Sequence, residues 1–75
     1  MGTLKRFGKF KLSVFGDEHG RVHFHLAGPD FNCALDLETM EILAGSAPAE
    51  ALRQARQWAV ENRAVIEAAW KERNQ

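Results

Sequence analysis

The chain has 75 residues, and its 10 basic and 10 acidic side chains give it a formal net charge of zero. A neutral chain offers no overall attraction for nucleic acid, and this length allows at most one domain, residues 1–75. The hydrophobic content of 45% argues against disorder. No apolar run approaches the roughly 18 residues of a membrane span. The start of the chain shows no signal peptide, and the single cysteine, Cys33, fits a cytoplasmic protein.

Three stretches in the first part of the chain alternate between apolar and polar residues, at 9–15, 21–27 and 31–37. This period of two predicts three strands, and the glycines and the proline between them predict turns. Shorter segments at 4–7 and 41–43 predict up to two more strands. We therefore expect an antiparallel meander of three to five strands within residues 1–44.

The second part of the chain, residues 46–74, is rich in helix-forming residues. Ser46 is the expected N-cap, with Pro48 in the first helical turn. Asn62 either begins a second helix or marks a kink in one continuous helix, and the sequence leaves both readings open. Our preferred interpretation is an α+β fold in which two C-terminal helices pack on one face of the meander.

Matching the apolar faces of the three strands predicts their register. Leu12 is placed opposite Phe24, and Phe24 opposite Cys33, so Cys33 is expected to be a small buried hydrophobe. The polar face then has His25 between Lys11 and Asn32. On the same face, Arg21 stands opposite Asp36, and His23 lies between Ser13 and Ala34.

Three histidines form the most distinctive feature of the sequence. His23 and His25 are two residues apart on one strand, so both side chains leave the same face, roughly 7 Å apart. His19 comes from the preceding turn, next to Glu18. These four side chains are candidate ligands of a divalent transition metal such as zinc, and the three histidines are candidate catalytic groups. Two points weigh against a metal: strand histidines on a solvent face are common, and Lys11 beside His25 would repel a cation.

The same face is partly basic, and Lys11, Arg21 and Asn32 are candidate binding residues on it. Together with the acid-free segment of Lys5, Arg6 and Lys9, this face could hold a phosphate backbone or an acidic partner. A histidine pair with a lysine could also cleave RNA by general acid–base catalysis without a metal. The alternative is an ordinary solvated face.

Several parts of the sequence resemble one bacterial family. They are Phe7-Gly8, the segment from Asp17 to Leu26, and the C-terminal Glu61-Asn62-Arg63, Glu67 and Ala69-Trp70. Together they resemble the family called domain of unknown function 4160, whose pattern maps onto Glu18, His19, His23 and His25 without assigning a reaction to them. Here the Gly20-Arg21-Val22 stretch lacks the prolines frequent in the family.

The resemblance implies a short cytoplasmic protein, often encoded beside a member of domain of unknown function 2442. That pairing has suggested a toxin–antitoxin module. We therefore expect a protein-binding or regulatory module, with a partner protein encoded nearby. The alternative is a small histidine-based hydrolase or nuclease, metal-dependent or metal-free, acting on RNA or another phosphoester. Whether the protein is an enzyme is left open by the sequence.

Overall fold

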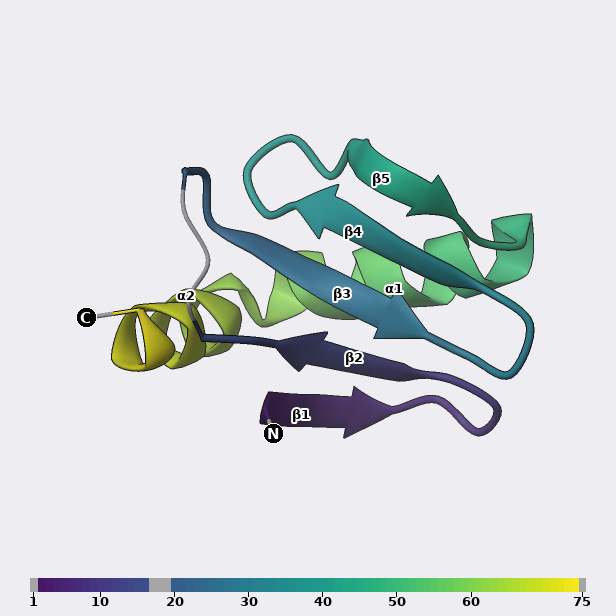
Figure 1. Cartoon of the computed structure of the whole chain (residues 1–75), viewed down its shortest axis with the longest axis horizontal. Helices are drawn as coiled ribbons and strands as arrows, with labels where there is room; N and C mark the ends of the chain where they lie inside the picture. Colours follow the sequence, from purple (N-terminus) through teal and green to yellow (C-terminus); the bar gives the residue numbers. More distant parts are fainter. Residues whose placement is uncertain (1, 17–19, 75) are drawn as a thin grey trace.

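Five antiparallel strands and two helices make up the fold of the computed structural model, which describes residues 2–16 and 20–74 (Figure 1). The strands follow one another in the sheet in chain order, and the two helices follow the last strand. This architecture confirms the expected α+β meander. The elements are β1 (Gly2–Arg6), β2 (Lys11–Val14), β3 (His23–Ala27), β4 (Asn32–Asp36), β5 (Ile42–Ser46), α1 (Ala49–Glu61) and α2 (Arg63–Arg73).

One face of the sheet carries the hydrophobic core. Alternate strand residues point toward the helices, and Leu12, Phe24 and Leu35 are completely buried. Helix α1 contributes Ala55 and Ala59, both completely buried, to this core, and helix α2 packs against β2 and β3. The remaining buried apolar residues are Phe10, Val14, Leu26, Cys33, Leu37, Ala51 and Ile66. Cys33 therefore lies in the core as expected, and burial raises the pKa of its thiol.

The predicted strand register is wrong by two residues in both hairpins. Leu12 pairs with Leu26 rather than with Phe24. Phe24 pairs with Leu35 rather than with Cys33. A shift of two keeps every apolar residue on the same face, because side chains alternate with a period of two. Apolar matching alone therefore could not distinguish the two registers.

The turn between β3 and β4 decides the register of that hairpin. The amide of Gly28 donates a hydrogen bond to the carbonyl of Phe31 at 2.9 Å, which leaves only Pro29 and Asp30 in the loop. A Cβ on Gly28 would lie 2.6 Å from the nearest atom of the Phe31 ring, so in the observed turn this ring packs against the bare backbone of Gly28. The sequence prediction assumed a longer loop.

The boundary between strands and helices also differs from the prediction. Ser46, the expected N-cap, is the last residue of β5, so the sheet runs past residue 44. Helix α1 begins at Ala49, and Pro48 occupies its N-cap position. At the other end, Asn62 separates α1 from α2 with a non-helical φ of −126°, and its side-chain amide donates to the Trp58 carbonyl. The structure thus has two helices rather than one kinked helix.

The face of the sheet turned away from the core, which we call the open face, carries rows of side chains that cross all five strands. Residues that pair between neighbouring strands share a face, so the pairings define these rows directly. One row runs Arg6, Lys11, Ala27, Asn32, Ser46, and the next runs Thr3, Ser13, His25, Ala34, Ala44. In these two rows, most side chains of the open face are small, and the larger ones are Arg6, Lys11 and His25.

We predict that Gly45→Ala destabilises the protein by more than about 2 kcal/mol. Gly45 has a φ of +76°, and a Cβ there would overlap the Asn32 carbonyl oxygen on the neighbouring strand. The left-handed conformation alone costs a residue with a Cβ roughly 1–2 kcal/mol. The matched control is Gly8→Ala, where φ is +83° and no described atom lies within 4 Å of the new Cβ. Urea unfolding measures the free energy of unfolding of both variants. If Gly45→Ala and Gly8→Ala lower it equally, the role given to the Asn32 contact is contradicted.

Candidate functional site

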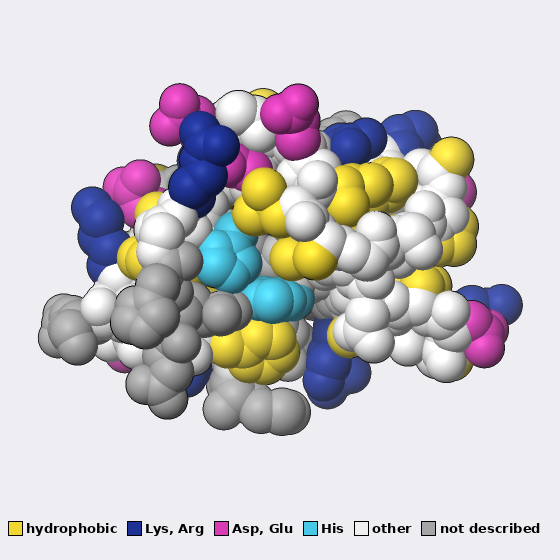
Figure 2. All heavy atoms as spheres, turned by 45° about the horizontal axis from the view of Figure 1, so that its top comes forward, with side chains coloured by type: hydrophobic (Ala, Val, Ile, Leu, Met, Phe, Trp, Pro, Cys, Tyr) yellow, Lys and Arg dark blue, Asp and Glu magenta, His cyan; other side chains and the backbone are white. Residues whose placement is uncertain are grey.

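His23 and His25 lie side by side on the open face, as the strand period predicts. Their ring centroids are 5.3 Å apart and the rings meet edge to face. Figure 2 shows the two described histidines (cyan) next to each other at the surface of the molecule. His19 and Glu18, the other candidate ligands, lie outside the described residues. The structure therefore shows a histidine pair, and the three-histidine site stays a prediction.

Two aromatic side chains flank the histidine pair. The Phe15 ring stands 4.8 Å from the His25 ring, and the Trp70 ring, from α2, stands 6.3 Å from the His23 ring. The Trp70 indole nitrogen is buried and has no hydrogen-bond partner among the described residues. Trp70 thus packs at the border between the core and the histidine pair, which sequence spacing alone did not indicate.

A backbone contact orients the His23 ring. Its Nδ1 lies 2.7 Å from the Arg21 carbonyl oxygen. A carbonyl can only accept, so Nδ1 carries the hydrogen and donates, which leaves the Nε2 lone pair as the basic site of the neutral ring. Histidines that bind metals are commonly held by such a bond through their other nitrogen. This arrangement makes Nε2 the atom of His23 that can accept a proton or bind a metal ion.

The corrected register removes one objection to a metal at the histidine pair. Lys11 pairs with Ala27, whereas His25 lies between Ser13 and Ala34, so the predicted position of Lys11 beside His25 is wrong. Within residues 2–16 and 20–74, however, no group of three or more His, Cys, Asp or Glu side chains is arranged to hold a metal. The described pair alone is therefore an incomplete ligand set.

The three candidate binding residues line three separate hollows. Lys11 lines a groove at one end of β1 and β2, and Asn32 lines a shallow hollow with His25 and Gly45. Arg21 lines a larger pocket of about 380 Å³ near the β4–β5 turn. The structure does not bring these three side chains to one site.

Asp36 is the buried charge in the pocket lined by Arg21. Its side chain is 1% exposed, and its Oδ1 accepts hydrogen bonds from the amides of Glu38 and Thr39 at 2.8 and 3.1 Å. Its Oδ2 lies 2.9 Å from the Arg21 Nε. The predicted Arg21–Asp36 contact is thus correct, although the strand partner of Asp36 is His23. The Thr39 and Glu38 amides, with Arg21 and His23, hold the pKa of Asp36 below its ordinary value.

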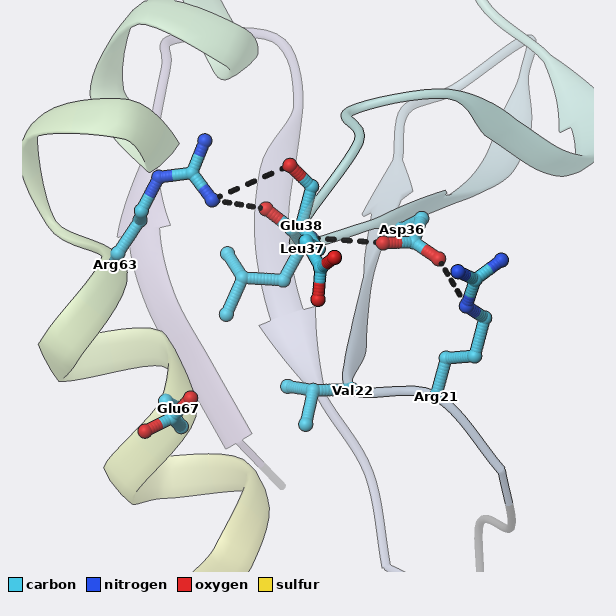
Figure 3. A pocket seen from close by; sticks show the side chains of 7 residues that line it. All are labelled: Arg21, Val22, Asp36, Leu37, Glu38, Arg63 and Glu67. Atoms are coloured by element: carbon cyan, nitrogen blue, oxygen red, sulfur yellow. Dashed lines mark hydrogen bonds and ion pairs between the residues drawn. The ribbon is translucent and has the colours of Figure 1, made fainter.

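Helix α2 closes the other side of this pocket. Arg63 donates to the carbonyl of Leu37 at 2.8 Å, and Glu67 lines the pocket from the next helical turn (Figure 3). Two guanidinium groups and several carboxylates therefore surround the opening, but most of them already bind one another or the backbone. The hydrogen bond of Arg63 beside this pocket connects α2 to the β4–β5 turn, so these side chains have a structural role.

An apolar sheet edge is the feature that sequence reasoning missed. All five residues of β5 are exposed, and none of them is charged. Ile42 and Leu43 are 40% and 47% exposed, so this edge presents large apolar side chains to its surroundings. The sequence indicated a short strand at 41–43. The alternation that marks a half-buried strand is interrupted here by a bulge at Leu43, because Ala34 pairs with Ala44 while Leu35 pairs with Ile42.

Comparison with known proteins identifies a family. The sequence profile of the domain of unknown function (DUF4160) matches residues 9–71. The chain belongs to this family. No curated protein and no solved structure matches it. Family membership confirms the resemblance carried by the histidine segment and the C-terminal residues, and it assigns no reaction.

Neither helix of the part of the chain that the structure describes is long and apolar enough to cross a membrane.

We predict that Asp36→Asn lowers the free energy of unfolding by about 1–3 kcal/mol at neutral pH, because a buried acceptor of charge-assisted bonds becomes a weaker one. The folded-state pKa of Asp36 is lowered from 3.8, so its contribution is present above that pH and is lost as pH falls below it. The difference in the free energy of unfolding between wild type and variant should therefore disappear in acid. Urea unfolding at several pH values measures this difference. Asp30→Asn, at an exposed position, is the control. An advantage that persists unchanged in acid would contradict the prediction.

Proposed function

We propose that the protein is a protein-binding module that accepts an extended strand of a partner protein along β5. The observation that supports this proposal is the uncharged and fully exposed edge strand Ile42–Ser46. An edge strand presents unpaired backbone N–H and C=O groups that a further strand can pair.

Proteins usually protect such edges with charges, prolines, bulges or a covering element. β5 has a bulge at Leu43, but it has no charged residue and no proline. The opposite edge differs, because β1 carries the exposed cations Lys5 and Arg6, which disfavour addition of a strand. The contrast between the two edges supports β5 as the edge used for association.

The chemistry near β5 also indicates what the partner strand carries. Glu38 and Glu41 are exposed at the turn that leads into β5. A partner strand that is apolar along its length and basic at the end facing this turn would complement the edge in both respects. We propose that the partner is the protein encoded beside this one, as in a toxin–antitoxin-like pair acting in the cytoplasm.

We predict that Leu43→Lys weakens the complex with that neighbouring protein at least about tenfold, or about 1.4 kcal/mol. A lysine at the centre of the edge must be desolvated when a strand is added. The measurement is calorimetric titration of the purified neighbouring protein into each variant. The matched control is Val65→Lys, because Val65 is 50% exposed but lies on α2.

Three outcomes would count against the proposal: no complex with the neighbouring protein, equal weakening by the two lysine variants, or no weakening by either. A wild type that forms only a dimer of itself, disrupted by Leu43→Lys, would assign the edge to a second copy and also overturn the proposed partner.

A histidine-based hydrolase is the second candidate function, and the orientation of His23 favours it. The Arg21 carbonyl accepts from Nδ1, so Nε2 is the ring nitrogen that would act as a base or as a metal ligand. His25 stands beside it, and His19 and Glu18 would have to complete a metal site. With zinc bound, such a site would supply an activated water for attack on a phosphoester.

For this candidate we predict about one zinc ion per purified chain, and a loss of most of this zinc in His23→Ala. The measurement is elemental analysis after growth with added zinc and gel filtration. Cys33→Ser, which changes a buried side chain on the other face, controls for adventitious binding by the thiol. A zinc content that is unaffected by His23→Ala would exclude His23 as a ligand.

A further inference from the structure

Three basic side chains line one groove at the end of the sheet, at the β1–β2 hairpin. Arg6, Lys9 and Lys11 surround a hollow of about 280 Å³ that is floored by Ala27 and Gly28 of the neighbouring strand and turn. Arg6 and Lys11 are direct strand partners, so their side chains leave the same face. Two like charges opposite each other destabilise a sheet unless an anion lies between them.

No carboxylate neutralises this groove among the described residues. Every ion pair found in residues 2–16 and 20–74 involves other side chains, namely Arg21–Asp36, Arg53–Glu50 and Lys71–Glu67. The chain as a whole is neutral, and yet these three cations stand together without acids. The groove therefore has the charge of an anion-binding site.

An exposed aromatic ring lies on the same face as the groove. Lys11, Ser13 and Phe15 are alternate residues of β2 and its extension, so Phe15 is about 13 Å from Lys11 along the strand. The Phe15 ring is 40% exposed and stands against His25, which confirms that it lies over the open face. On β2 only Ser13 lies between Lys11 and Phe15 on this face, and its small side chain is 2% exposed, so no large side chain of this strand separates the groove from the ring.

We propose that the open face binds single-stranded nucleic acid, with backbone phosphates in the groove of Arg6, Lys9 and Lys11 and a base stacked on Phe15. Basic grooves next to exposed rings on a sheet are the means by which proteins hold unpaired bases. An acidic peptide would use the groove but would gain nothing from the ring. This surface lies on β1 to β3, whereas the proposed partner strand adds at β5, so the two activities are separable.

The test is fluorescence anisotropy with a labelled twelve-nucleotide oligouridine, and with oligothymidine of the same length to compare RNA with DNA. If three phosphates are neutralised, the logarithm of the association constant should fall with the logarithm of the salt concentration at a slope of about −2. Lys11→Gln removes one of these contacts and should make the slope shallower by about 0.7. The matched control is Lys71→Gln, an exposed lysine on α2 that is paired with Glu67. It should leave both affinity and slope unchanged.

The second variant tests the ring. Phe15→Leu keeps an apolar side chain, so we expect binding to weaken by roughly five- to hundredfold while the salt slope stays the same. Circular dichroism and urea unfolding verify that each variant is folded. Binding of either oligonucleotide with these two signatures supports the proposal. It is overturned by no binding at low salt, by an oligoglutamate peptide that competes as well as oligouridine, or by a Phe15→Leu variant that binds like the wild type.

Discussion

The buried carboxylate of Asp36 joins two separate parts of the chain, the β4–β5 turn and the residue that precedes the strand of the histidine pair. One oxygen shapes the β4–β5 turn through the amides of Glu38 and Thr39, and the other faces Arg21 just before β3. The turn it shapes also places the Leu37 carbonyl where Arg63 of α2 binds. A charge removed from water must be compensated by several partners at once, so Asp36 links the β4–β5 turn to Arg21, and Arg63 links that turn to α2.

Both candidate surfaces depend on that arrangement. The β4–β5 turn sets the course of β5 and hence the exposed edge, while Arg21 precedes the strand that presents His23 and His25. Arg21 contributes twice, since its guanidinium faces Asp36 and its carbonyl holds the His23 ring. The stability of the hairpin and the orientation of the imidazole are therefore coupled through a single residue.

Much of the fold could be read from the sequence, because a period of two and a change to helical composition are strong local signals. The pattern also placed Cys33 in the core and His23 and His25 on the open face. The register could not be read in this way, since a slip of two residues leaves every apolar side chain on its own face. The turn at Gly28 to Phe31 contained the missing information, as a two-residue loop allows one register only. The site was less predictable. Trp70 approaches His23 through the tertiary packing of α2. Lys11, Arg21 and Asn32 line three separate hollows, which depends on the register and on neighbouring loops.

Gly45 limits how the edge of β5 can be protected. Because Gly45 has a φ of +76° and a side chain there would collide with the Asn32 carbonyl, this position cannot acquire a protecting charge, which leaves that role to the other positions of the strand. A molecule whose β5 is uncovered therefore presents an apolar edge strand to its surroundings, and in a crowded solution such strands aggregate or attract proteases.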